Sequence, residues 1–513
     1  MHPFRLYNAL TRTVEPLEPS EQTKGGTPLL RFYCCGPTVY SYAHIGNFRT
    51  FLTADLIVRT AEAIGWQVNY VSNVTDVGHL TEDDTADASG EDRMAKALKS
   101  KEGEQFANVW DLARHYTSAL MADWQALNLR EPTVRPRATE HVREQIRAVE
   151  ALMENGHAYE TNDGVYFHVP SFPDYGKLSG NTDIETLAVG AAAESREVVV
   201  DEDKRDPRDF ALWKKDDAHL MQWYSPFGWG FPGWHLECSV MAQKYLGETI
   251  DLHGGGEDLR FPHHECEIAQ AEAITGKPFA RHWSHTRFLQ VEGKKMSKRD
   301  GNFLTLHDLT ASSDYGGRDD WGAPVDPLAL RLALISGHYG KPFNFTQAAL
   351  KAAAKNIQRY HDADEAVQAA IATNREGEDS LEAPLADAYG DALAAMCDDL
   401  NTPEALAAAY RGVNVILSQH RQEPLSGAAA QSADDFLNRI NGLLGIVRHE
   451  SPDGPPPKED DAFAEHVESL LEQRTAARSS KDWARADAIR DEIDALGVEV
   501  MDNPTGSTWR RKL

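Results

Sequence analysis

Cysteine, basic residues and long apolar runs are all scarce in this sequence. Only five of its 513 residues are cysteine, two of them adjacent at positions 34 and 35, which excludes a disulfide framework and favours reduced thiols or metal ligands. No window approaches twenty uninterrupted apolar residues, and no secretion signal is recognisable. We therefore expect a cytoplasmic protein that has no membrane partner.

Basic residues are the minority among the charges. The 52 Lys and Arg face 80 Asp and Glu, which gives a formal net charge of −28. A protein that coats nucleic acid non-specifically needs many cationic contacts with phosphate, so that class is excluded, although a local basic site is not. The acidity itself is explained by solubility or by adaptation to a salty cytoplasm, and the sequence does not decide between them.

The first third of the chain has an α/β pattern. An apolar run over 29–35 predicts a buried strand, the periodic apolar residues from His44 predict a helix that ends before Gly65, and 66–74 alternates as a strand. This order is a βαβ unit, whose ligand site lies at the carboxyl ends of the strands. A further strand at 249–253 resumes the pattern after a long interruption, which predicts an insertion in a doubly wound fold.

The remainder of the chain is mostly helical. At a length of 513 residues two to four domains are expected. Ala-rich helical patterns extend to about Val447, the Pro-rich and charged stretch 449–461 has the composition of a linker, and a small terminal module follows.

His44-Ile45-Gly46-Asn47 opens the first helix, where free backbone N–H groups and the helix dipole favour anions. Gly46 lets a ligand approach the backbone, and His44 can donate to phosphate oxygens. A helix that merely starts with a histidine is the alternative. A second motif, the cationic run 294–299, suits phosphoryl or nucleotidyl transfer if it is a mobile loop, whereas its alternative is a solvated charge run.

A third motif has metal-ligand spacing. Pro262 suits the first turn of a helix, which puts His263 and Glu267 at i and i+4 on one face, with Cys266 also within reach at i+3. Cys35 and Cys238 are distant thiols that can complete a tetrahedral set. Adjacent strand residues point to opposite faces, so Cys34 and Cys35 should not both be ligands. Packing in a core is the alternative for each of these side chains.

The terminal module carries a basic pattern. Its basic residues at i, i+4, i+7 and i+11 predict a stripe along one helical face, and the tail adds an aromatic side chain beside cations. A solubilising face with a buried tryptophan explains the stripe equally well. The residues are Arg474, Arg478, Lys481 and Arg485, followed by Trp509, Arg510 and Arg511.

These residues together resemble the class I aminoacyl-tRNA synthetases, since 44–47 (HIGN) matches their HIGH signature and 295–299 (KMSKR) matches KMSKS. Within that class the chain is most similar to the cysteinyl-tRNA synthetases, through 35–40 (CGPTVY), 232–238 (PGWHLEC), 253–265 (HGGGEDLRFPHHE) and 506–512 (GSTWRRK). The resemblance implies ATP-dependent attachment of L-cysteine to tRNA(Cys) through cysteinyl-adenylate, with zinc selecting the substrate thiolate. We expect a monomer.

The resemblance also implies roles for single residues. One zinc ion per chain would be held by Cys35, Cys238, His263 and Glu267, and Mg²⁺ would accompany ATP. Catalytic roles fall on His44, Asn47, Lys295 and Lys298. Contacts with ATP fall on His44, Gly46, Asn47, Gly255, Asp258 and Lys298, and the amino-acid pocket on Thr75 and Trp234. The seven basic and aromatic residues of the terminal module become anticodon contacts. Two positions depart from the signatures: Asn47 replaces a His and Arg299 replaces a Ser.

The fold that the resemblance implies is α/β: a Rossmann-like class I synthetase catalytic domain with an inserted connective domain, followed by an α-helical bundle and a small C-terminal anticodon-binding module. The expected divisions are 1–125 and 232–290 for the two halves of the catalytic domain, 126–231 for the connective domain that contacts the acceptor stem, 291–345 for the KMSKS loop and stem-contact region, 346–448 for the bundle, 449–461 for the linker and 462–513 for the module.

Two other functions remain open from the sequence. A cysteine ligase of the mycothiol pathway, which joins cysteinyl-adenylate to an amino sugar, would share the nucleotide fold and the zinc pocket. It would need neither the long helical region nor the terminal module. A non-catalytic tRNA-binding or zinc-storage paralogue is the third interpretation, and the presence of His44 and Lys298 argues against it.

Overall fold

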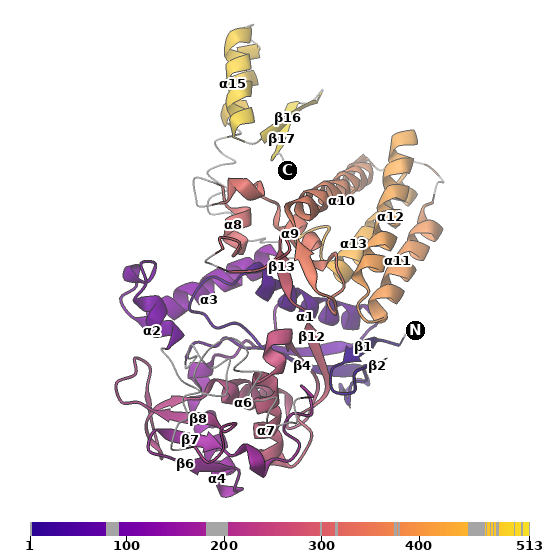
Figure 1. The fold of residues 1–513 in the computed structure, drawn as a ribbon. Coiled ribbons are helices and arrows are strands. Elements are labelled where there is room, and N and C mark those ends of the chain that lie inside the picture. Colours follow the sequence, from indigo (N-terminus) through magenta and orange to yellow (C-terminus); the bar gives the residue numbers. More distant parts are fainter. Residues whose placement is uncertain are drawn as a thin grey trace.

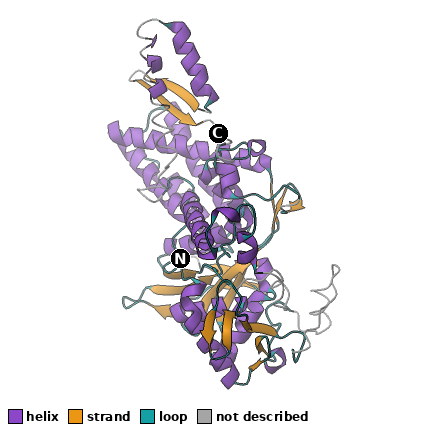
Figure 2. Cartoon of the chain, turned by 90° about the vertical axis from the view of Figure 1, so that its left-hand side faces the viewer, coloured by secondary structure: helices purple, strands orange, loops and turns teal. Residues whose placement is uncertain are grey.

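The computed structural model describes residues 3–77, 92–180, 204–297, 300–312, 317–373, 377, 380–449 and, in short stretches, most of 467–511; over 499–511 it describes the backbone alone. Figures 1 and 2 show an elongated molecule with most of its strands toward one end and the helical bundle toward the other. No helix within the described ranges is both long and apolar enough to cross a membrane.

The parallel sheet contains the predicted βαβ unit. Parallel strands lie in the order β12-β11-β4-β5, and the short β3 joins the start of β4 in antiparallel orientation. Helix α1 connects β4 to β5 and lies above the sheet in Figure 1, whereas α6 and α7 lie below it. The elements are β3 (Glu21–Gln22), β4 (Pro28–Cys34), α1 (Ile45–Ala63), β5 (Gln67–Ser72), α6 (Trp234–Leu246), β11 (Ile250–Gly256), α7 (His263–Thr275) and β12 (Ala280–Thr286).

Strand β11 runs three residues further than the sequence predicted, through the glycines at 254–256. Each of these glycines lies against a neighbour: a Cβ on Gly254 would be 3.1 Å from the Phe32 ring, and one on Gly255 would be 2.7 Å from the His264 ring. Glycine is therefore required there by close approach rather than by a turn, and all seven residues of the strand are buried.

The insertion is an antiparallel sheet with its own apolar core, which includes Val165, Leu212 and Trp213. Its strands lie in the order β6-β7-β8-β10-β9, and β10 leads directly into α6. The elements that precede and form it are α2 (Arg93–Leu98), α3 (Val109–Ala126), α4 (Val142–Glu154), β6 (Ala158–Glu160), β7 (Gly164–Phe167), β8 (Phe210–Lys215), β9 (Trp223–Ser225) and β10 (Gly228–Pro232).

The helical part packs on the outer side of α1, and one apolar core continues from the parallel sheet into it. In Figure 1 the bundle helices stand beside one another above α1. They are α10 (Gln347–Thr373), α11 (Glu382–Cys397), α12 (Thr402–Gln422) and α13 (Gly427–Leu444). Between sheet and bundle lie β13 (Leu289–Val291), β14 (Lys294–Lys295), α8 (Leu306–Thr310), α9 (Pro327–Ile335) and β15 (Phe343–Phe345); β1 (Arg5–Asn8) pairs with β2 (Thr13–Pro16).

The terminal module corrects one prediction. Described residues between 467 and 478 are helical, but Asp482 is not, and its side chain accepts a hydrogen bond from the Arg485 backbone N–H at 3.1 Å. Asp482 therefore caps a new helix, α15 (Trp483–Ala495). The basic stripe is not one helical face, because Arg474 and Arg478 precede this break and Arg485 follows it. Strands β16 (Val498–Asn503) and β17 (Gly506–Arg511) then form a hairpin.

Candidate active site and metal centre

Four metal-ligand side chains converge below the carboxyl ends of the central strands. Cys35 directly follows β4, Cys238 lies on α6, and His263 and Glu267 lie one turn apart on α7. One ligand atom from each lies within 4.8 Å of every other, and all four residues are buried. The structure thus brings together, from three elements, the set that the family resemblance implied.

The distances fit a tetrahedral zinc ion. With Zn–S bonds of about 2.3 Å, two sulfur ligands stand about 3.8 Å apart, and Cys35 Sγ lies 3.6 Å from Cys238 Sγ. Glu267 Oε1 lies 3.4 Å from Cys35 Sγ and 3.1 Å from His263 Nε2. Two sulfurs, one nitrogen and one carboxylate oxygen are a donor set that zinc accepts.

The electrostatics of the cluster also favour a cation. Burial opposes ionisation of Cys238, but hydrogen bonds from Cys35 and His263 outweigh it and lower the pKa of the thiol to about 6. Burial alone would lower the pKa of His263, yet the Glu267 carboxylate raises it to about 10. The site therefore stabilises a positive charge at its centre, as a divalent metal would supply.

Two further histidines contact the predicted metal ligands and fix their orientation. His253 on β11 lies with Nε2 2.8 Å from Glu267 Oε2, and His235 on α6 lies with Nδ1 2.9 Å from His263 Nδ1. Such contacts set the orientation of metal-binding side chains. These two histidines were not predicted as site residues from the sequence, although His253 directly precedes the glycine run and His235 lies in the same motif as Cys238.

A second set of four shares two members with the first. Cys35 and Glu267 also lie within 4.8 Å of ligand atoms of His253 and His264. His264 Nε2 stands 3.5 Å from Cys35 Sγ, and its Nδ1 lies 2.9 Å from His285 Nε2. The set with Cys238 is the better match to zinc, because it offers two sulfur donors and one of them has a lowered pKa.

The other cysteines near the motif point elsewhere. Burial raises the pKa of Cys34 to about 12, and Cys34 belongs to neither set of ligand atoms. Cys266 lies 3.4 Å from the Tyr175 hydroxyl, and its pKa is raised well above its ordinary value by burial. Both thiols are inert packing groups in this environment.

Thr75 and Trp234 lie beside the metal donors. The Thr75 hydroxyl donates to Glu237 Oε2 at 2.9 Å, and Glu237 is the neighbour of Cys238. The Trp234 ring stacks on His263, with centroids 4.2 Å apart. Trp234 thus contacts a predicted ligand directly, and Thr75 contacts the residue that precedes another.

The first turn of α1 explains why asparagine suits position 47. The Asn47 backbone N–H donates to His44 Nδ1 at 3.1 Å, and the His44 backbone N–H donates to Asn47 Oδ1 at 3.1 Å. This reciprocal capping box fixes the imidazole with Nδ1 as acceptor, which places its proton on Nε2 as a donor for an anion.

The cationic segment begins as a hairpin rather than as a loop. Glu292 and Gly293 both have positive φ, and Lys294–Lys295 form β14 against β13. Two residues with positive φ match the turn that joins tightly twisted strands. The segment also touches α1, because a Cβ on Gly46 would be 2.9 Å from Met296 Cε. Lys298 and Arg299 lie outside the described residues.

The other residues that were predicted to contact ATP or tRNA lie outside the four-residue ligand set. Gly255 is the penultimate residue of β11 and lies against the His264 ring, and Asp258 follows in a short 3₁₀ turn (Glu257–Arg260). The terminal module belongs to another part of the molecule, at the far end from the insertion in Figure 1. There Arg474, Arg478 and Arg485 are helical, Trp509–Arg511 are backbone of β17, and Lys481 lies outside the described residues.

Known proteins match the chain over its whole length. The family model of the class I (C) tRNA synthetase catalytic domain matches 22–355, the DALR domain matches 393–448, and the cysteinyl-tRNA ligase anticodon binding domain matches 460–510. A cysteine–tRNA ligase of Salinibacter ruber is 57% identical, over 99% of this chain and 98% of the relative. One from Chlorobaculum tepidum is 40% identical over 100% of both chains.

The fold alone is shared with a more distant solved structure. Mycobacterium tuberculosis methionyl-tRNA synthetase in complex with methionyl-adenylate superposes with a TM-score of 0.53 at 14% identity, and the match covers 82% of this chain and 90% of the other.

Proposed function

Because the chain belongs to the cysteinyl-tRNA synthetase family, we propose that Cys35, Cys238, His263 and Glu267 hold one zinc ion that receives the substrate thiolate. The protein is a cysteine–tRNA ligase that attaches L-cysteine to tRNA(Cys) with ATP. The match to an anticodon binding domain and the full-length relatives disfavour the amino-sugar ligase and the non-catalytic paralogue.

The observation that carries the zinc proposal is the mutual approach of the four donor atoms to within 4.8 Å. When bound, zinc offers a soft Lewis-acid position at which a thiolate binds far better than the less acidic hydroxyl of serine. A pocket that reads shape alone discriminates such small differences by roughly 10–200-fold. Trp234 and Thr75 enclose this position and orient the amino acid.

The residues of α1 and of the cationic segment act on ATP. His44 Nε2 donates to phosphate oxygens as the cysteine carboxylate attacks the α-phosphate of Mg-ATP, and Lys295 and Lys298 neutralise the developing charge. Gly46 and Asn47 keep the helix N-terminus open to the phosphates, while Gly255 and Asp258 contact the ribose. Pyrophosphate leaves in this step. The terminal adenosine hydroxyl of tRNA then attacks the carbonyl carbon of the cysteinyl-adenylate, which forms the ester and releases AMP.

We also propose a cytoplasmic monomer, the domain divisions given above, and anticodon contact by the terminal module through Arg474, Arg478, Lys481, Arg485 and Trp509–Arg511. The single test of the function is a matched set of assays on the purified full chain. We expect about one zinc per chain by elemental analysis, cysteine-dependent ATP–pyrophosphate exchange, and charging of tRNA(Cys) but not of an amino sugar. Equal charging by serine would refute selection by the metal.

A further inference from the structure

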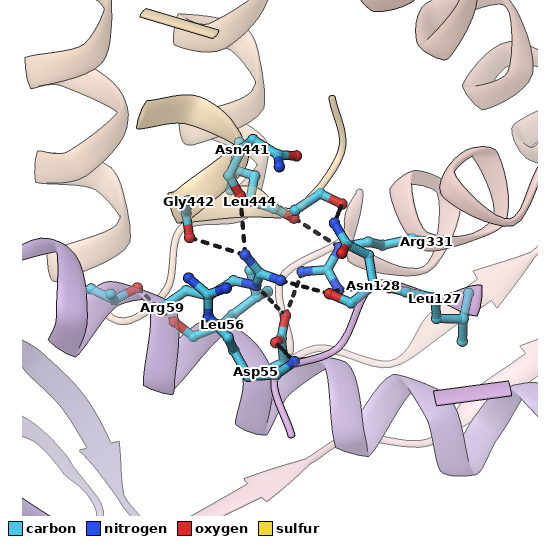
Figure 3. Close-up of polar contacts among 12 residues, drawn as sticks. Asp55, Leu56, Arg59, Leu127, Asn128, Arg331, Asn441, Gly442 and Leu444 are labelled. Atoms are coloured by element: carbon cyan, nitrogen blue, oxygen red, sulfur yellow. Dashed lines mark hydrogen bonds and ion pairs between the residues drawn. The ribbon is translucent and has the colours of Figure 1, made fainter. Parts of the chain in front are cut away.

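Three charged side chains are completely buried between the catalytic domain and the helical bundle. Asp55 and Arg59 lie one turn apart on α1, Arg331 lies on α9, and each side chain has 0% exposure. Asp55 Oδ2 accepts from Arg59 Nε at 2.8 Å and from Arg331, and Oδ1 accepts from the Arg130 backbone N–H at 2.7 Å. Figure 3 shows the three side chains meeting at this point.

The two arginines extend from Asp55 to the end of α13. Arg59 Nη1 donates to the carbonyls of Asn441 and Gly442 at 3.0 and 3.1 Å, and Arg331 Nε donates to Leu444 at 2.8 Å. These carbonyls belong to the last turn of a helix, where few intrahelical donors remain, and the Asn441 carbonyl also accepts from the Gly445 backbone N–H at 2.7 Å. The last turn of α13 is thus capped by side chains of two other helices, which join it to α1.

The same guanidinium groups hold the segment that follows α3. Arg59 Nη2 donates to the Asn128 carbonyl at 2.6 Å, and Arg331 Nη1 donates to the carbonyls of Leu127 and Asn128 at 2.9 and 3.1 Å. Asn128 itself donates to the carbonyls of Gly445 and Arg448 at 3.0 Å each. Four segments that are far apart in the sequence therefore meet on one buried carboxylate.

The charge balance shows that the cluster is built around the end of α13. Two guanidinium groups and one carboxylate leave one positive charge in the interior. The C-terminus of a helix carries roughly half a negative charge, which partly offsets it. Buried charged side chains that only fill space can often be replaced by apolar ones without loss of stability. These three side chains instead make directional hydrogen bonds to three elements.

We propose that Asp55, Arg59 and Arg331 are positioning residues that fix the bundle, from which the tRNA-binding end of the chain continues, relative to the active site. Asp55 lies ten residues from Ile45 on one continuous helix, about 15 Å along its axis. The opposite end of that connection, α13, is the last bundle helix before the 449–461 linker. Charging of tRNA needs this geometry, while formation of the adenylate does not.

This inference rests on the tRNA charging proposed above, and Arg331 offers the sharpest test. Arg331→Lys keeps a charge near Asp55 but cannot reach the Leu444 and Leu127 carbonyls together, since lysine lacks the planar fork. Arg331→Met leaves the Asp55–Arg59 pair neutral, so no unpaired buried charge results. Arg411→Lys is the matched control, because Arg411 pairs with Asp391 at an exposed position of the same bundle.

Cysteine-dependent pyrophosphate exchange, tRNA charging and the thermal midpoint are measured for all three variants. For both Arg331 variants we expect kcat/KM for tRNA to fall by about tenfold or more, mainly through KM, and exchange to stay within about threefold. The control should match the wild type. A parallel fall in both activities, no change in either, or failure of both variants to fold would overturn the proposal. Absence of tRNA charging by the wild-type protein would instead refute the proposed function itself.

Discussion

Glu267 divides its two carboxylate oxygens between the ligand cluster and His253. Oε1 faces His263 Nε2 at 3.1 Å and Cys35 Sγ at 3.4 Å, and Oε2 lies 2.8 Å from His253 Nε2. Burial raises the pKa of Glu267, but the two histidines outweigh burial and hold it well below its ordinary value. The carboxylate is therefore ionised, and His253 donates to it and fixes its orientation.

Loss of the His253 contact should weaken metal binding without removing a ligand. We expect His253→Ala to reduce zinc affinity by about 10–100-fold, measured by competition with a coloured chelator. His282→Ala is the control, because His282 is buried on the neighbouring β12 but stands 3.9 Å from Glu15, away from the cluster. Equal zinc release from both variants would show that His253 does not orient Glu267.

Zinc binding and the activation of cysteine by ATP should be separable by mutation. Cys238→Ser replaces a thiolate donor by a hydroxyl, so we expect most of the zinc to be lost, whereas Lys298→Ala should keep zinc and lower pyrophosphate exchange by about 10²–10³-fold. Elemental analysis and the exchange assay on the same preparations check both results. If each variant lost zinc and exchange to the same extent, this division of roles would be wrong.

Two structural constraints favour glycine at position 445, and their effects on stability can be measured separately. It ends α13 with φ at +67°, and an added Cβ would lie 2.7 Å from the Arg331 guanidinium. Gly276 ends α7 with φ at +68° and has nothing within 4 Å of its Cβ position. Both Ala variants pay the backbone cost of about 1–2 kcal/mol, and only Gly445→Ala meets the arginine.

Urea unfolding should therefore show Gly445→Ala to be less stable than Gly276→Ala by about 1–3 kcal/mol, the usual cost of overpacking a buried site. If Gly276→Ala lost more stability than Gly445→Ala, the Arg331 guanidinium group would have to move freely. That result would also contradict the tight arrangement around Asp55.

Much of the active site was predictable because its signals are local. The spacing of His263 and Glu267 needs only one helical turn, and the βαβ pattern follows from apolar periodicity. Cys35 and Cys238 could be named only as distant thiols able to complete the set, since no local rule connects residues about two hundred positions apart. The family resemblance chose Glu267 over Cys266. Asn47 looked like a departure from a signature, and only the capping box explains it.

One prediction from the sequence was wrong and one structural feature was missed, each for a physical reason. The basic stripe failed because helical periodicity was extended across Asp482, whose preference for an N-cap outweighs the periodic pattern. The Asp55 cluster was missed because a charged residue on a helix is normally exposed, and nothing in the sequence around Arg331 shows that its partners are carbonyls of a helix more than a hundred residues away.

Stability should depend on pH through Asp123 on α3. Burial raises the pKa of this carboxyl to about 7, against an ordinary value near 4. Ionisation is thus harder in the folded chain, so its contribution to stability is complete below about pH 4 and is lost as the pH rises through 7. Asp123→Asn stays neutral and should exceed the wild type at pH 8 by about 1–2 kcal/mol, reduced from the full value because the side chain is partly exposed.

Asp163 provides the control of opposite sign. Burial opposes ionisation there too, but hydrogen bonds from Lys214 and Tyr166 outweigh it and lower the pKa to about 2. Its stabilising contribution is present above about pH 4 and is lost as the pH falls through 2, so Asp163→Asn should cost the same between pH 5 and pH 8. Urea unfolding at four pH values separates the two carboxyls: the Asp123→Asn advantage must grow from pH 5 to pH 8 while the Asp163→Asn loss stays level. A constant difference for Asp123→Asn would show that this carboxyl ionises as it does in water.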